Sequence, residues 1–206
     1  GPNNNLIKEI INKNKYNLIF FVDCGSNSSE EIYKLEKNGI KTIVIDHHQI
    51  YKKTDYKNSV IINPLKLKNE SRFNYFCATT LVYFFIKYVN SKLKNKITIK
   101  DNKYLFFSSV ATICDQMPLR NINRLIVKKG LNKYDNNNFF IFKKLLKLKN
   151  KISSTDIGFN LGPLLNSPGR LGYHDLPINL LIEKDSKNIN QICEKLIILN
   201  EKRKKI

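Results

Sequence analysis

The stretch "KTIVIDHHQ", residues 41–49, combines an apolar run with an acid and two histidines. Its first part is a short apolar run rich in β-branched residues, which is typical of a buried strand. The run ends in Asp46, His47 and His48, although the whole chain contains only 3 histidines. A single histidine at a strand end would be read as a helix cap or a core hydrogen-bonding residue. Two adjacent histidines behind an acid indicate a functional site instead.

Similar runs on both sides of this stretch predict a parallel sheet. "NLIFFVD" (17–23) and "SVIIN" (59–63) are short apolar runs that also end in polar residues. Residues 28–39 begin with serine and two acids and end in Asn-Gly, which predicts a helix. Strand, helix and strand with short joints form the βαβ pattern of an α/β fold with a parallel β-sheet core. Ligands of such sheets bind at the carboxyl ends of the strands.

Beyond residue 76 the pattern becomes mostly helical. Residues 76–93 are apolar enough for a buried helix, and residues 102–116 predict another helix that ends before Pro118. "NSPGRLG" (166–172) is expected to be a loop because it contains glycine and proline. Further predicted helices cover residues 121–131, residues 138–149 and the long basic C-terminal segment 186–206.

Composition indicates a globular protein without a membrane span. The 206 residues are 42% hydrophobic, and the longest apolar runs are far too short to cross a bilayer. The beginning of the chain shows no signal-peptide pattern. The 4 cysteines form no CxxC pair, which favours free thiols. We therefore expect a cytoplasmic protein.

The net charge of +19 has two explanations that stay open. A chain with 36 basic and 17 acidic residues attracts polyanions such as nucleic acid. The chain is also rich in Lys, Asn and Ile, as AT-rich coding drift would produce, and charge alone does not separate the two explanations.

Two strand ends carry a candidate metal site. Asp23 ends one predicted strand before the turn-forming Cys-Gly-Ser, and the Asp-His-His stretch ends the next strand. Carboxylate and imidazole together suit Mn²⁺, Fe²⁺ or Zn²⁺. Because adjacent residues do not easily bind one ion, one of His47 and His48 should bind metal while the other faces the substrate or supports the ligands.

A third acid, Asp115, follows an apolar helical run in "VATICDQMPL" (110–119). A carboxylate buried there would be costly without a partner. A helix cap, a salt bridge and a metal ion are the alternatives.

These motifs together resemble the DHH phosphoesterase superfamily. "VDCGS" (22–26), "VIDHHQ" (44–49) and "VATICDQMPL" occur in that superfamily's order, and residues 157–172 are similar to a segment peculiar to its RecJ branch of single-strand-specific 5′→3′ exonucleases. The resemblance covers essentially the whole chain. It implies a DHH core over residues 1–185 and the start of a linker helix over 186–206. It also implies hydrolysis of single-stranded DNA to 5′-mononucleotides in DNA repair and recombination.

The resemblance further implies a site with two Mn²⁺ or Mg²⁺ ions. Asp23 would bridge the ions, and His47 and Asp115 would complete the shell of one ion. Asp46 would orient a ligand, and His48 would contact the scissile phosphate. The implied catalytic residues are Asp23, Asp46, His47, His48 and Asp115, and the implied phosphate-binding residues are His48, Asn166, Gly169 and Arg170.

Some of these assignments have plain structural alternatives. Tyr75, Phe76 and Tyr173 could stack on bases, although core packing or simple exposure explains each of them as well. Cys24 and Cys114 flank two implied ligands and could bind a softer metal as thiolates, but packing of small residues also explains them.

The chain departs from the superfamily pattern in one respect. No Asp-x-Asp occurs in it, although the resemblance implies such a motif before residue 1, and the Gly-Gly-His signature of the C-terminal domain is absent. The remaining ligands are too few for two ions, so we expect weak or no nuclease activity from this polypeptide alone. It could be an excised part of a longer chain, a piece of a split gene, or a protein that takes these carboxylates from another chain or segment.

Two other functions stay open. One is a DHH phosphodiesterase for oligoribonucleotides or cyclic dinucleotides, which digestion of a long strand against a dinucleotide would separate from the exonuclease. The other is a non-catalytic DHH scaffold, which should bind Mn²⁺ no better than a generic acidic surface.

Overall fold

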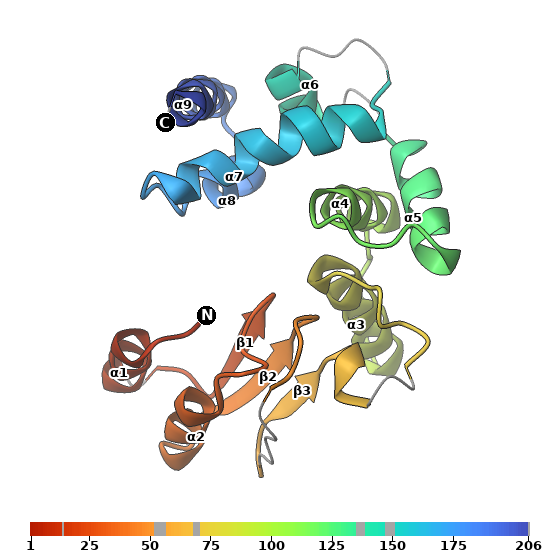
Figure 1. Cartoon of the computed structure of the whole chain (residues 1–206). Helices are drawn as coiled ribbons and strands as arrows, with labels where there is room; N and C mark the ends of the chain where they lie inside the picture. Colours follow the sequence, from red (N-terminus) through yellow and green to blue (C-terminus); the bar gives the residue numbers. More distant parts are fainter. Residues whose placement is uncertain (14, 52–56, 68–70, 135–138, 147–150, 206) are drawn as a thin grey trace. The chain divides into compact units, whose positions relative to one another are not determined.

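A computed structural model describes residues 1–13, 15–51, 57–67, 71–134, 139–146 and 151–205. The chain consists of two compact units, Gly1–Ile99 and Lys100–Ile206, each with its own internal packing (Figure 1). The predicted boundary between residues 185 and 186 separates the DHH core from a linker helix, and it stays a prediction.

The first unit contains the predicted parallel sheet. Its strands are β1 (Leu18–Val22), β2 (Lys41–Ile45) and β3 (Val60–Ile62), in the order β1-β2-β3, and α2 (Ser29–Lys37) connects the first two. All described strand pairs are parallel, so the expected α/β fold with flanking helices is confirmed.

The register of this sheet aligns the three strand ends. Val22 pairs with Ile45, and Ile45 pairs with Ile62. The ladder continues one residue further, because the N–H groups of Asp23 and Asp46 donate to Ile45 O and Ile62 O at 2.9 and 3.1 Å. The polar residues that follow the strands therefore lie along one rim, as sheets of this kind require for a ligand site.

Helices cover both faces of the sheet. Phe21, Val44 and Ile61 occupy one row across the strands and face α2 and α1 (Asn4–Lys13), a helix that we did not predict. On the opposite face, α3 (Ala78–Lys92) places the ring of Phe85 6.0 Å from that of Phe20. The expectation that α3 is buried is wrong for most of its length, since its buried residues are confined to the first turn: Ala78, Thr80 and Leu81.

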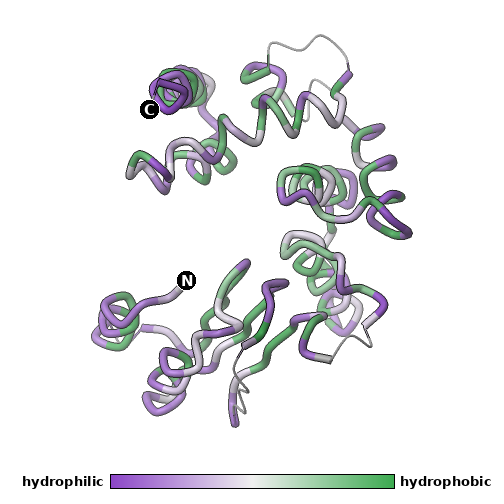
Figure 2. The backbone as a smooth tube through the Cα atoms, viewed as in Figure 1, coloured by the Kyte–Doolittle hydropathy of each residue, from purple (hydrophilic) through white to green (hydrophobic). Residues whose placement is uncertain are grey.

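The second unit is helical. Phe106 lies at the centre of its core, with the rings of Phe139 and Phe142 at 4.2 and 5.4 Å. Most of its helices alternate between hydrophobic and hydrophilic positions, as expected when one side of a helix is buried (Figure 2). The elements are α4 (Asp101–Cys114), α5 (Asn121–Leu131), α6 (Phe140–Leu146), a π-helical segment (Asp156–Leu161), α7 (Gly162–Arg170), α8 (Leu176–Ile182) and α9 (Ser186–Lys204). No helix among the described residues is long and apolar enough to cross a membrane.

The long C-terminal helix is confirmed as α9, and Asp185 caps it by accepting from Asn188 N at 2.9 Å. The end of the helix predicted over 138–149 lies outside the described residues, since α6 ends at Leu146.

The predicted loop over residues 166–172 is wrong. Most of this stretch is the last part of α7, which contains Pro168 in its interior. Proline removes the N–H that would reach the carbonyl four residues earlier. In this helix that carbonyl belongs to Leu164, and it accepts a hydrogen bond from Ser167 Oγ at 3.3 Å instead. A side-chain hydroxyl thus compensates for the bond that proline removes.

Close contact between α4 and α5 predicts a stability effect at Gly130. A Cβ there would lie 1.9 Å from Ser109 Oγ and 2.7 Å from the Leu105 carbonyl oxygen. The same hydroxyl shares its one hydrogen between Leu105 O and Ile126 O, both at 2.9 Å, and these contacts hold it in place. We expect Gly130→Ala to lower the free energy of unfolding by about 1–3 kcal/mol in urea denaturation.

Gly158→Ala is the matched control, because its Cβ would meet only Ile113 Cγ2 at 3.5 Å, an ordinary contact. It should leave stability unchanged or raise it by about 0.4–1 kcal/mol. Equal effects of the two substitutions would contradict the packing described for α4 and α5.

Candidate metal and phosphate site

The rim of the sheet is organised around Asp46, whose side chain is buried. One carboxylate oxygen accepts from the backbone N–H groups of His47 and His48 at 2.8 and 3.3 Å and from His48 Nδ1 at 2.7 Å. The other oxygen accepts from Ser26 N at 3.1 Å. Asp46 therefore ties the turn after β1 to the turn after β2.

These hydrogen bonds control the charge of Asp46. Burial by itself would raise the pKa of this carboxyl, but hydrogen bonds from His48 and Ser26 outweigh it and lower the pKa to about 2. An ionised carboxylate only accepts hydrogen bonds, so His48 must carry its proton on Nδ1. The Nε2 lone pair of His48 is then available to a metal ion or another donor, and the exposed ring presents it to solvent.

Asn63 is a positioning residue that we did not assign from the sequence. It follows β3 and is buried. Its Nδ2 donates to Ser26 Oγ at 2.8 Å and to the carbonyl of His48 at 2.9 Å, while its Oδ1 accepts from Leu65 N. Asn63 thus links all three strand ends. The position of Asn63 directly after an apolar run was the sequence signal that could have identified it.

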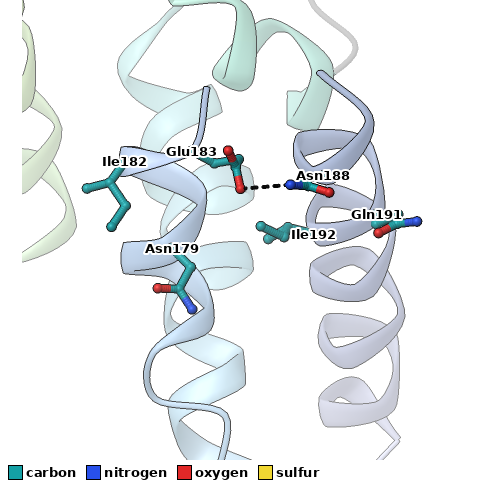
Figure 3. Close-up of a pocket in the computed structure, with 6 residues that line it drawn as sticks. All are labelled: Asn179, Ile182, Glu183, Asn188, Gln191 and Ile192. Carbon is teal, nitrogen blue, oxygen red and sulfur yellow. Dashed lines mark hydrogen bonds between the residues drawn. The ribbon is translucent and has the colours of Figure 1, made fainter. Parts of the chain in front are cut away.

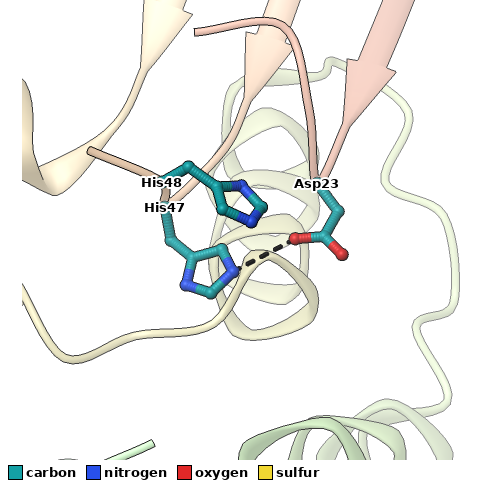
Figure 4. Close-up of side chains that lie close together, drawn as sticks. All are labelled: Asp23, His47 and His48. Atoms are coloured by element: carbon teal, nitrogen blue, oxygen red, sulfur yellow. Dashed lines mark ion pairs between the residues drawn. The ribbon is translucent and has the colours of Figure 1, made fainter. Parts of the chain in front are cut away.

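Asp23, His47 and His48 lie together at this rim (Figure 4). His47 Nε2 is 3.1 Å from Asp23 Oδ1, and one ligand atom from each of the three residues lies within 4.8 Å of the others. Asp23 has a positive φ of 62°, which is uncommon outside glycine. Such backbone strain often occurs at ligand sites.

This donor set fits a divalent cation. Two ligand atoms about 2.1 Å from an octahedral ion and at right angles to each other are about 3.0 Å apart. The separation of Asp23 Oδ1 from His47 Nε2 is close to that value. One carboxylate with imidazole nitrogen is a donor set that suits Mn²⁺ and related ions.

The surroundings of the Cys24 thiol stabilise its neutral form. Burial raises its pKa, and the carboxylates of Asp46 and Asp23 raise it further, against the opposing effect of the chain's amino terminus. The neutral thiol is therefore favoured. None of the described cysteines, Cys24, Cys77, Cys114 and Cys193, forms a disulfide, as predicted.

The other predicted site residues belong to the second unit, so their convergence with Asp23 and His47 stays a prediction. Asp115 follows α4 and is exposed, so the premise that it is buried is wrong. Asn166 and Arg170 line one cavity of about 150 Å³. Gly169 precedes Arg170 near the end of α7.

The predicted aromatic stacking residues divide by exposure. Tyr75 and Phe76 are buried, and Phe76 stacks on Phe73 at 5.2 Å, so neither is free to stack on a base. Tyr173 is exposed, with Lys195 Nζ 4.6 Å from its ring centroid.

A larger hollow of about 490 Å³ between α8 and the start of α9 contains no predicted site residue (Figure 3). Glu183 lines this hollow, and its carboxylate accepts hydrogen bonds from the N–H groups of Lys184 and Asp185 and from Asn188 Nδ2. These bonds hold the turn that connects α8 to α9.

Comparison with known proteins agrees with this geometry. The profile of the DHH family, N-terminal domain, matches residues 2–108. The chain belongs to the DHH family. Within this family, the name-giving residues Asp46, His47 and His48 of this chain divide into one buried carboxylate and two rings at the rim.

Curated DHH-family relatives match nearly the whole chain. The single-stranded-DNA-specific exonuclease RecJ of Bacillus subtilis is 25% identical over 210 residues, covering 100% of this chain and 26% of its own length. The protein of the same name from Thermus thermophilus is 24% identical and covers 90% of this chain and 27% of its own length. The chain therefore spans about a quarter of the length of these relatives.

Solved structures show the same fold. A crystal structure of RecJ from Thermus thermophilus in complex with Mn²⁺ has a TM-score of 0.78 at 24% identity and covers 97% of this chain and 30% of that chain. A crystal structure of exonuclease RecJ bound to manganese has a TM-score of 0.79 at 22% identity and covers 100% of this chain and 51% of that chain.

The low pKa of Asp46 predicts a pH-dependent contribution to stability. A folded-state pKa of about 2, below the ordinary 3.8, stabilises the protein above about pH 4, and this stabilisation is lost as the pH falls toward 2. With chelator present, Asp46→Asn should lower the free energy of unfolding by about 2 kcal/mol at pH 6.

The difference from wild type should shrink between pH 4 and pH 2 in urea denaturation. Asp175→Asn is the control, because Asp175 is exposed and its side chain does not cap α8. A difference that stays constant across this pH range would contradict the charged state assigned to Asp46.

Proposed function

We propose that this chain forms the core of a metal-dependent exonuclease that cleaves phosphodiester bonds of single-stranded DNA to 5′-mononucleotides in DNA repair and recombination. The observation that carries the proposal is the cluster of Asp23, His47 and His48 at the strand rim of a DHH-family chain. Curated relatives over the whole chain are named single-stranded-DNA-specific exonucleases.

The proposed cofactor is Mn²⁺ or Mg²⁺. Related structures are titled as complexes with manganese, and another RecJ structure as a complex with Mg²⁺. Asp23 and His47 are the proposed ligands in the first unit, and Asp115 is proposed to complete the set. Such ions lower the pKa of water and offset charge on phosphoryl oxygens when bound.

The protein's own side chains would position the substrate. Asp46 fixes the His48 ring through Nδ1, so Nε2 is directed outward, where we propose that it contacts the scissile phosphate. Arg170 would hold a phosphate oxygen through its guanidinium, helped by the Asn166 amide and by close backbone approach at Gly169.

We also propose that further carboxylates come from a segment or chain that carries an Asp-x-Asp. The cluster of Asp23, His47 and His48 has three donors, which is too few for two ions. β1 is an edge strand of the described sheet, so its outer side offers unpaired backbone groups to another strand.

The protein is proposed to act in the cytoplasm, because the described cysteines form no disulfide and the proposed substrate is DNA.

Metal binding tests the proposal at its first step. Asp23→Asn and His47→Gln should each weaken Mn²⁺ binding by roughly tenfold or more in isothermal titration calorimetry, because each removes a direct ligand. Asp175→Asn and His174→Gln are matched controls, since both residues are exposed outside the cluster and should leave the affinity unchanged. Equal Mn²⁺ affinity in wild type and Asp23→Asn would contradict the proposed site.

Catalysis is tested with 5′-labelled single-stranded DNA and Mn²⁺, with and without an added segment that carries the Asp-x-Asp. Mononucleotide release should be weak without the segment and increase with it. Release that is unaffected by Asp23→Asn would contradict the proposed catalytic role.

A further inference from the structure

The cavity that contains Arg170 has a second guanidinium. Arg203, from the last turn of α9, lines the same space of about 150 Å³ together with Asn166. Helices α7 and α9 pack directly against each other, so the two arginines approach the cavity from neighbouring elements of one unit. Neither the sequence motifs nor the net charge singled out Arg203 among 36 basic residues.

Among the described residues, the positive charges of Arg170 and Arg203 have no acidic partner. No described carboxylate forms an ion pair with Arg170 or Arg203. Glu201, two residues before Arg203, is engaged by Lys204 Nζ at 2.8 Å. Two guanidiniums that line one small space repel each other, so an anion between them would be stabilised.

Arg203 also has an unused donor. Its Nε is buried and has no hydrogen-bond partner among the described residues. A buried donor without an acceptor is unfavourable, which indicates a missing acceptor at this position. The fork of a guanidinium suits oxygens of phosphate in particular.

The cavity has the size and surroundings for one phosphate group. A volume of about 150 Å³ leaves room for a phosphate group, since about 10–15 Å³ of such space already holds one water molecule. Gly162 permits this close packing, since a Cβ there would lie only 3.0 Å from Cys114 Sγ. The preceding segment Asp156–Leu161 is π-helical, a geometry frequent at functional sites.

We propose that Arg203 and Arg170 together bind one phosphate group of a nucleic-acid strand in this cavity. The identity of the anion as a nucleic-acid phosphate rests on the proposed function. The role of Arg203 as a second cation rests on the cavity itself. The site would therefore hold the strand from two helices, α7 and α9, rather than from the "NSPGR" stretch alone.

The test uses the whole chain in the presence of EDTA, so that neither metal binding nor cleavage is required. Binding of inorganic phosphate is measured by calorimetry, and binding of a labelled oligothymidylate by fluorescence anisotropy over a range of KCl concentrations. Arg203→Gln and Arg170→Gln should each weaken phosphate binding by about tenfold. Because the two arginines share one phosphate group, replacing both with glutamine should lower the salt slope of strand binding by about 0.7, the value for one phosphate contact.

Lys202→Gln is the matched control, because Lys202 is exposed on the same turn and does not line the cavity. It should leave phosphate affinity unchanged. Arg203→Lys keeps the charge but loses the fork, so its phosphate affinity should be intermediate. If Arg203→Gln does not fold, the affinity of Arg203→Lys decides instead.

The inference would be overturned if Arg203→Gln bound phosphate as tightly as wild type. If that variant does not fold, wild-type affinity in Arg203→Lys would overturn it. Loss of phosphate binding without any change in strand binding would overturn the assignment to a nucleic-acid phosphate. A chain that binds phosphate through Arg203 but binds no Mn²⁺ would refute the proposed nuclease and leave this site standing.

Discussion

The candidate site depends on the buried carboxylate of Asp46. Its side chain is only 2% exposed, and burial of such a charge costs several kcal/mol unless donors surround it. The hydrogen-bond donors come from Ser26, His47 and His48. Asp46 is therefore ionised only when the rim has this backbone path, and the ionised carboxylate in turn holds the rim in that path. A rim with a different backbone path would leave this carboxylate without partners. The arrangement therefore selects one conformation of the residues after β1 and β2.

The register of the sheet places the residues that follow the strands next to one another. Because β1, β2 and β3 are parallel and aligned at their carboxyl ends, Asp23, Asp46 and Asn63 follow their strands at the same level. Asp46 and Asn63 are used for support, whereas Asp23 and the two imidazoles remain as donors for a ligand. The supporting groups are buried, whereas Asp23 and His48 are exposed and His47 is partly buried, an arrangement in which buried residues orient the donors.

Short apolar runs with polar ends made the sheet predictable, since few other structures accommodate "KTIVID" between two similar runs. The helix through Pro168 was not predictable from composition, because the compensating bond from Ser167 to Leu164 is a geometric detail. Asn63 carries no signal beyond its place after a strand. Arg203 was hidden by the abundance of basic residues. The prediction from sequence that Asp23 and His47 lie close together was correct. The prediction that Asp115 is buried was wrong, because Asp115 follows a helix of which only the inner face is apolar.

We propose that Asp23 and His47, held by the Asp46 network, coordinate one divalent cation. Anomalous diffraction from crystals of the chain soaked in Mn²⁺ tests it most directly. A manganese peak is expected about 2.1–2.3 Å from both Asp23 Oδ1 and His47 Nε2. A peak bound to other residues only, with these two atoms still paired to each other, would contradict it.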